Sequence, residues 1–247
     1  MSSYKKEIGT AVQNFAGDPA NPLTGQLWYD SNASEFKYQE QVTGNAWSTG
    51  NSMNTAKVFP GGAGTQTAAL AFGAFNPSTS ANTELYDGSS WTEVNNLNVA
   101  RGRMGSNGTS TSALGYGGAN PSISNQTESW NGTNWTAVAT LNTARQQLAG
   151  AGADNTSALA FGGFNPPTYY ANTESWNGSS WTEVADLNTA RRDLGGNGII
   201  TSALAYGGDT PGSTAATESW NGSSWTDVAD LNTARRLAGA GTDNTNA

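Results

Sequence analysis

TESWNGSSWTEVADLNTAR, the stretch from Thr173 to Arg191, decides the fold because near-copies of it recur along the chain. The copies align on their second tryptophan, which falls at Trp47, Trp91, Trp135, Trp181 and Trp225. These positions are 44, 44, 46 and 44 residues apart. A constant period in the forties is typical of repeat proteins, and a propeller blade is the commonest all-β unit of that size. The sequence therefore predicts an all-β propeller.

Each repeat contains four short strands separated by turn signals. In the third repeat, residues 148–154 are rich in glycine and alanine, which suits a crowded strand near a propeller axis. Residues 157–161 are apolar and end at Gly162 and Gly163, and a loop that varies between repeats follows. Residues 172–176 and 180–184 complete the set, and Asn177-Gly178 between them favours a type I′ hairpin turn. A four-stranded antiparallel blade is predicted.

The two ends of the sequence supply complementary parts of one further blade. Residues 235–247, RRLAGAGTDNTNA, read as a first strand, and residues 25–30, 34–38 and 45–49 read as second, third and fourth strands. We therefore expect a five-bladed propeller over residues 25–247, closed by pairing of residues 237–241 with residues 26–29. Residues 1–24 lie outside the repeat and form an N-terminal arm, either loosely docked or serving to attach a partner.

Composition excludes several classes of function. The chain has 247 residues, no cysteine and no histidine, so it lacks Ser-His-Asp and Cys-His nucleophiles and thiolate or imidazole metal sites. Two-carboxylate glycosidase chemistry stays formally open, but most carboxylates recur in every repeat, whereas an active site is normally singular. We expect no enzyme activity, no metal and no cofactor. The net charge of −8 disfavours nucleic acid, and no apolar run suits membrane insertion or a signal peptide.

The repeat resembles the kelch repeat over residues 25–247. The shared features are a Gly-Gly pair, an aromatic residue on the third strand and a tryptophan five residues later, as in Gly117-Gly118, Trp130 and Trp135. Kelch propellers usually have six or seven blades and a longer repeat, so five blades depart from that pattern. The recurring tryptophans suggest either packing between blades or repeated sugar-stacking sites, and packing is the simpler interpretation.

Residues 17–39, GDPANPLTGQLWYDSNASEFKYQ, followed by the near-identical repeats resemble kelch-like repeat proteins of marine bacteriophages. That resemblance implies a virion or fibre component, made in the host cytoplasm, whose partners are virion proteins or a glycan or protein of the host surface. The function expected is a non-catalytic binding or structural module. A lectin-like propeller with repeated glycan sites is the alternative, and a protein adaptor is the third.

Two sets of residues are candidate sites. The loops between second and third strands vary most and hold the candidate ligand-binding residues Phe75, Phe164, Asn165, Tyr169, Tyr170 and Asn172. A second set opens the first and third strands and predicts a structural ring of ion pairs, made by Lys57, Arg101, Arg145, Arg191 and Arg235 with Glu84, Glu128, Glu174 and Glu218. Phe36 stands where a fifth glutamate would be, so an anion site at the axis is the alternative.

Overall fold

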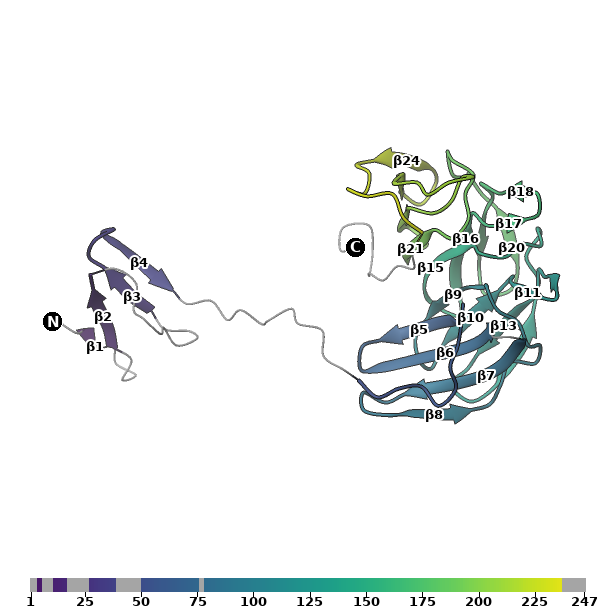
Figure 1. Ribbon diagram of the computed structural model, residues 1–247, viewed down its shortest axis with the longest axis horizontal. Helices are drawn as coiled ribbons and strands as arrows, with labels where there is room; N and C mark the ends of the chain where they lie inside the picture. The colour runs from purple at the N-terminus through teal and green to yellow at the C-terminus, as the bar shows by residue number, and fades with distance from the viewer. Residues whose placement is uncertain (1–3, 6–10, 17–26, 39–49, 76–77, 237–247) are drawn as a thin grey trace. The chain divides into compact units, whose positions relative to one another are not determined.

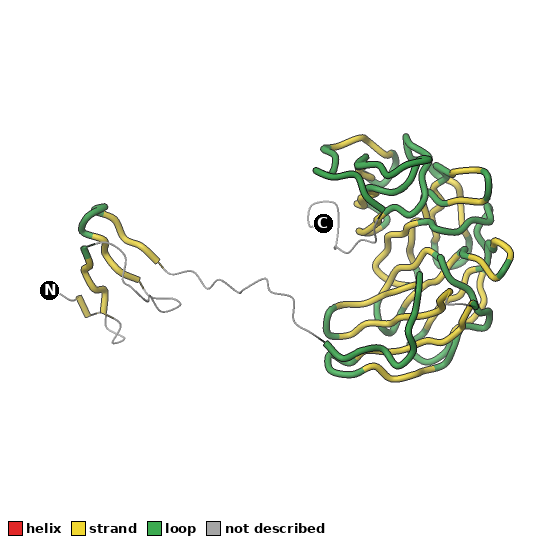
Figure 2. The backbone as a smooth tube through the Cα atoms, viewed as in Figure 1, coloured by secondary structure: helices red, strands yellow, loops and turns green. Residues whose placement is uncertain are grey.

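A computed structural model describes residues 4–5, 11–16, 27–38, 50–75 and 78–236 (Figures 1 and 2). The chain divides into two compact units, Met1–Thr49 and Gly50–Ala247. Within the described ranges all regular structure is strand, with no helix in either unit (Figure 2). The prediction of an all-β chain is confirmed.

The N-terminal unit contains one four-stranded sheet in the order β1-β2-β3-β4. Its strands are β1 (Tyr4–Lys5), β2 (Ala11–Phe15), β3 (Leu27–Asp30) and β4 (Glu35–Tyr38). The strands β3 and β4 form an antiparallel hairpin, as predicted, whereas β2 pairs with β3 in parallel. Asp30 holds the hairpin turn, because its carboxylate accepts the backbone N–H groups of Asn32 and Ala33 and forms an ion pair of 2.9 Å with Lys37 Nζ.

In residues 50–75 and 78–236 the second unit contains four four-stranded sheets, which we call blades 1 to 4, each antiparallel throughout. Blade 1 consists of β5 (Gly61–Thr65), β6 (Ala68–Phe75), β7 (Thr79–Tyr86) and β8 (Trp91–Val94). Blade 2 consists of β9 (Gly105–Gly108), β10 (Ala113–Tyr116), β13 (Thr127–Trp130) and β14 (Trp135–Val138). Blade 3 consists of β15 (Ala149–Asp154), β16 (Ser157–Phe161), β19 (Thr173–Trp176) and β20 (Trp181–Glu183). Blade 4 consists of β21 (Gly195–Ile199), β22 (Ser202–Tyr206), β23 (Thr217–Trp220) and β24 (Trp225–Val228). These repeated four-stranded sheets are consistent with a β-propeller.

Two of the loops between second and third strands form small hairpins of their own. They pair β11 (Ala119–Asn120) with β12 (Ser122–Ile123) in blade 2, and β17 (Phe164–Asn165) with β18 (Thr168–Tyr169) in blade 3.

The turn between third and fourth strands differs from the predicted type I′ turn. Trp176 pairs directly with Trp181, so four residues connect the strands rather than two. Asn177 Oδ1 accepts the backbone N–H groups of Ser179 and Ser180, both at 3.0 Å, and only Gly178 takes a positive φ, of 92°. The Asn-Gly pair therefore marks the turn correctly, but the asparagine acts through its side chain.

The first strand of each blade lies on the inner side of the unit, where β9 neighbours β5 and β15, and β15 neighbours β21 (Figure 1). Glycine is required there by close packing. A Cβ atom built on Gly105 would overlap the ring of Tyr116. The glycine- and alanine-rich composition of these strands follows from that crowding.

Aromatic side chains fill the interfaces between consecutive blades. Trp181, for example, lies 5.0 Å from the ring of Tyr116 in the preceding blade, and its Nε1 donates a 3.1 Å hydrogen bond to Thr127 Oγ1. The same pair of contacts joins Trp135 and Trp225 to the blades before them. These contacts confirm the packing role expected of the tryptophans. Replacing one such buried ring by alanine costs about 3–5 kcal/mol of folding stability.

The described sheets do not close into a ring. Residues 39–49 and 237–247, which hold the predicted fourth strand and the predicted closing strand, lie outside the described residues. The strand β3 has β2 along one edge and β4 along the other, so β2 takes the edge that the closing strand would need. The first compact unit ends at Thr49, and residues of the predicted arm contribute β1 and β2 to it.

Candidate functional site

The repeated cations and glutamates form buried ion pairs within the blades. The pairs are Lys57–Glu84 at 3.5 Å, Arg101–Glu128 at 2.5 Å, Arg145–Glu174 at 3.2 Å and Arg191–Glu218 at 2.6 Å. Burial lowers the pKa of the three arginines, although their glutamate partners act to raise it. With side chains at most 2% exposed, none of these pairs is accessible to a ligand.

Each glutamate also holds the segment that leads into its blade. Glu174 accepts the backbone N–H groups of Asn142 and Thr143, and Glu218 accepts those of Asn188 and Thr189. The arginine that follows completes the set of donors. These carboxylates are therefore structural, because every one of their strong hydrogen bonds serves the connection between blades.

The fifth cation, Arg235, has a different environment. Its backbone occupies the same position as that of its counterparts, since its carbonyl accepts the N–H of Gly208 as that of Arg145 accepts the N–H of Gly118. Its side chain is exposed, and Nε donates to the carbonyl of Thr233. No glutamate within the described ranges pairs with it, so this member of the predicted ring stays unpaired there.

A second ring of residues lies two positions after the repeated cations. It consists of Phe59, Arg103, Gln147 and Asp193, which we call the axial residues. All four have left-handed backbone conformations, with φ of 53°, 57°, 56° and 51°. Backbone hydrogen bonds of 3.0, 2.7 and 3.0 Å join each axial residue to the next, from Phe59 to Asp193. Left-handed conformations are unfavourable for such side chains and tend to concentrate at functional sites.

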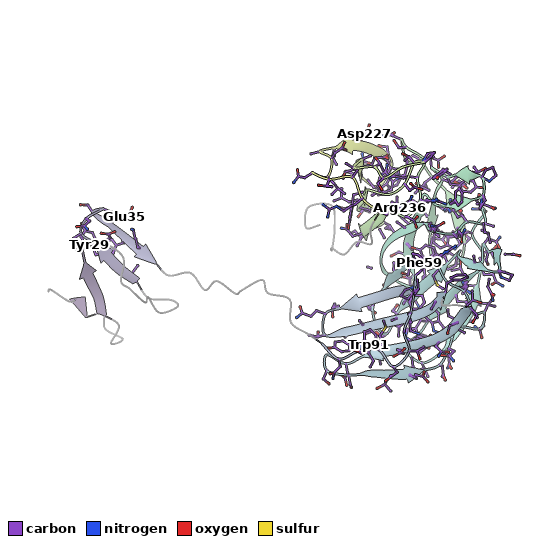
Figure 3. All side chains as sticks on the ribbon, in the orientation of Figure 1. Tyr29, Glu35, Phe59, Trp91, Asp227 and Arg236 are labelled. Carbon is purple, nitrogen blue, oxygen red and sulfur yellow. The ribbon has the colours of Figure 1, made fainter. Side chains whose placement is uncertain are left out.

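The axial residues line a hollow of about 750 Å³, whose walls are the inner strands β5, β9, β15 and β21. Phe59, labelled in Figure 3, is 50% exposed. Each blade places a different side chain here: an aromatic ring, a cation, an amide and a carboxylate. Gln147 Nε2 donates to both carboxylate oxygens of Asp193, at 2.7 and 2.9 Å. The mouth of the hollow is therefore chemically asymmetric although the blades are near-copies.

Arg103 is held between two aromatic rings. Its guanidinium carbon lies 5.2 Å from the centroid of Phe59 and 4.8 Å from that of Phe75. Its Nε atom is buried without a hydrogen-bond partner. No ion pair joins Arg103 to a carboxylate in the part of the chain that the structure describes. We call this group the Arg103 clamp.

Arg192 is held in a similar way, but its charge is compensated. Its guanidinium carbon lies 4.2 Å from the centroid of Phe164 and 5.2 Å from that of Tyr169, and its Nε pairs with Asp209 at 2.9 Å. Asp209 also pairs with Arg236 at 2.8 Å and accepts a 3.2 Å hydrogen bond from the Tyr169 hydroxyl. Burial acts to raise the pKa of Asp209, but the hydrogen bonds from Arg236 and Arg192 hold it below its usual value. We call this group the Arg192 clamp.

The six loop residues predicted to bind ligand have different surroundings. Phe75, 38% exposed, belongs to the Arg103 clamp. Phe164 and Tyr169 belong to the Arg192 clamp, where their ring centroids lie 4.9 Å apart and the rings are tilted by 57°. Asn165 Nδ2 donates a long hydrogen bond of 3.4 Å to the carbonyl of Ala144. Tyr170 and Asn172 are half-buried and bond through their backbones to the blade. Phe75 alone among the six lies beside an uncompensated charge.

The sequence reasoning missed the axial residues, although the repeats carry a signal for them. The residues before each repeated cation are nearly identical, but the two that follow read VF, GR, QQ and RD in the four blades. Divergence directly beside a near-identical stretch indicates that the side chains there do not make the contacts that every blade repeats.

Within the ranges described, no helix is long and apolar enough to cross a membrane. The same residues contain no cluster of three or more acidic, histidine or cysteine side chains that could hold a metal ion. A scan against protein-family models finds no match to the chain, and neither does a search of curated protein sequences.

Proposed function

We propose that this chain is a non-catalytic binding or structural module of a bacteriophage particle, which contacts a host surface or another virion protein. The observation that carries the proposal is the divergence of otherwise near-identical blades at the axial residues. A scaffold whose blades differ around one hollow and in the loops beside it suits recognition by that face.

A catalytic function is disfavoured, because the buried carboxylates already have structural roles. Glu84, Glu128, Glu174 and Glu218 each hold a connecting segment and pair with a cation, so their hydrogen-bonding capacity serves the fold. With neither histidine nor cysteine in the sequence, the mouth of the hollow offers a cation, aromatic rings and hydrogen-bond acceptors. Such a set suits non-covalent recognition.

The assignment to a particle rests on the resemblance of residues 17–39 to the lead-in of marine phage repeat proteins. We assign attachment to a virion protein to residues 1–24, which lie outside the repeats, and recognition of the partner to the blades. In this proposal the protein is located in the virion.

We further propose that a fifth blade closes the propeller, built from residues 25–49 and residues 235–247. The end of blade 4 supports it, because Asn232, Thr233 and Arg235 are exposed there. Their counterparts Asn188, Thr189 and Arg191 bond to Glu218, a glutamate of the blade that they lead into. Closure requires the C-terminal strand to replace β2 beside β3. A chain that lacks residues 236–247 should then expose an unpaired edge and aggregate. If that truncated chain stays monomeric with unchanged thermal stability, the proposed closure is wrong.

The lectin-like alternative would use repeated sites. The tryptophans that would serve them are not available to a sugar, because Trp130, Trp176 and Trp220 are 1–2% exposed and pack in the apolar clusters between consecutive blades. A single site at the mouth of the hollow therefore fits the structure better than one site in each blade.

The experiment that tests the proposed function combines location with surface variants. The protein should co-purify with intact particles, and the isolated chain should bind host cells or a virion protein. Replacing Phe59 and Phe75 by serine should weaken that binding. The matched control is Thr133→Ser in the exposed turn between β13 and β14, where blade 3 already has Ser179 at the equivalent position, and it should leave binding unchanged.

Two outcomes would contradict the proposal. Undiminished binding of the Phe59 and Phe75 variant, with loss on changing the turns between third and fourth strands, would assign recognition to the other face. Absence from particles together with saturable glycan binding would favour the lectin-like alternative.

A further inference from the structure

Arg103 is an unusual cation for this protein. The paired arginines of the blades are each matched to a glutamate, and Arg192 is matched to Asp209. Arg103 has aromatic neighbours but no carboxylate partner in the described ranges. Its buried Nε has no hydrogen bond, but the same is true of Arg101, Arg145 and Arg191, so the missing carboxylate is what distinguishes Arg103. A half-buried guanidinium without a carboxylate is a costly arrangement unless a ligand supplies the negative charge.

The backbone at Arg103 has the left-handed conformation that all four axial residues share. Its φ of 57° places it in the left-handed region, and the carbonyl of Arg103 is fixed by the N–H of Gln147. The side chain is thus presented at the mouth of the hollow by a strained backbone that both neighbouring blades hold in place. Preorganisation of this kind lowers the cost of binding an anion.

The surroundings narrow the class of anion. Phe59 and Phe75 leave apolar ring surface exposed beside the guanidinium, and Gln147 and Asp193 offer oxygen acceptors to hydroxyl groups. Arg103 is the only cation among the four axial residues, and the protein carries a net charge of −8. This field repels polyanions, so a ligand with one negative charge on a hydroxylated, otherwise neutral body fits best.

We propose that Arg103 anchors a site for a carboxylate-bearing sugar, the uronic acid class, at the mouth of the hollow. The guanidinium donates two hydrogen bonds to the carboxylate, the exposed rings of Phe59 and Phe75 contact the C–H face of the sugar, and Gln147 and Asp193 accept from its hydroxyls. The proposal rests on the proposed function, because it names the ligand class of the same face.

Calorimetric titration of the full chain with methyl β-D-glucuronide tests the site, with methyl β-D-glucoside as the neutral counterpart. The glucuronide should bind about 10- to 100-fold more tightly than the glucoside, the ratio expected of a charge-assisted hydrogen bond. Arg103→Gln should remove that preference. Glutamine is chosen because Gln147 already occupies the equivalent left-handed position in the next blade. Arg103→Lys keeps the charge without the fork and should retain part of the preference.

Arg235→Gln is the matched control, because its side chain is exposed, bonds to the carbonyl of Thr233 and does not line the hollow, so its loss should leave glucuronide affinity within about threefold of wild type. Equal affinity for the two sugars, no binding at millimolar concentration, or an unchanged preference in folded Arg103→Gln would overturn the proposal. Tighter binding of a peptide with a single aspartate, lost in Arg103→Gln, would overturn the assignment to sugars. Since the titration needs neither particles nor host cells, its failure leaves the proposed function to be judged by its own test.

Discussion

The Arg103 and Arg192 clamps hold the same chemical group in two electrostatic settings. In both, a guanidinium lies within about 5 Å of two aromatic rings at the same end of the blades. Only Arg192 has a carboxylate, and Asp209 is itself bound by Arg236 and Tyr169. The comparison distinguishes Arg192, whose charge is matched within the fold, from Arg103, whose guanidinium would need a ligand to supply a hydrogen-bond acceptor.

The largest loss of stability is expected when a fully buried, ion-paired arginine is replaced. Arg145→Ala should lower the free energy of unfolding by about 3–5 kcal/mol, because it leaves Glu174 charged in a site where both side chains are fully buried. Denaturant unfolding measures the loss. Arg235→Ala, at the exposed counterpart of the same repeat position, should change it by less than about 0.5 kcal/mol. Equal losses in the two variants would show that the buried pairs are not what holds the blades.

Asp209→Ala converts the Arg192 clamp into an uncompensated one. It should lower the free energy of unfolding by about 1–3 kcal/mol, since two arginines and the Tyr169 hydroxyl lose their acceptor. The same denaturant experiment on Glu93→Ala, an exposed carboxylate of blade 1, is the control and should show almost no loss. An unchanged free energy of unfolding in Asp209→Ala would mean that aromatic contacts alone hold Arg192.

The sequence predicted these structural pairs because repetition reveals them. A cation before each first strand and a glutamate on each third strand recur at one spacing, and a four-stranded meander brings the two starts to the same end of a blade. The interblade tryptophans were predictable for the same reason, because a large apolar ring repeated in every unit needs a repeated place to pack.

Features without repetition were not predictable in this way. The parallel pairing of β2 with β3 joins segments that no local pattern relates, so the residues of β2 read as an arm. The turn at Asn177 was recognised, but its length depends on side-chain hydrogen bonds that the Asn-Gly pair does not specify. The axial residues stand out in the sequence only because they differ between near-identical repeats. The sites predicted from the sequence were instead the repeated positions and the longest loops.

Acid should weaken the Arg192 clamp by titrating Asp209. The folded-state pKa of Asp209 lies below its usual value of about 4, so its contribution is present above that pH and is lost as the pH falls through the folded pKa. The difference in unfolding free energy between wild type and Asp209→Asn should therefore be largest near neutral pH and shrink below about pH 4. Denaturant unfolding over that pH range measures it. A difference that grows on acidification would contradict the assigned pairing.

The most direct measurement is a side-by-side determination of the unfolding free energy of Arg103→Gln and Arg192→Gln. If Arg192 serves the fold and Arg103 serves a ligand, Arg192→Gln should lose about 1–3 kcal/mol by leaving Asp209 short of a partner. Arg103→Gln should change stability by less than about 0.5 kcal/mol, since it removes an uncompensated charge and places glutamine where Gln147 is tolerated. A loss at Arg103 as large as that at Arg192 would show that both clamps are structural, and would contradict the assignment of Arg103 to recognition.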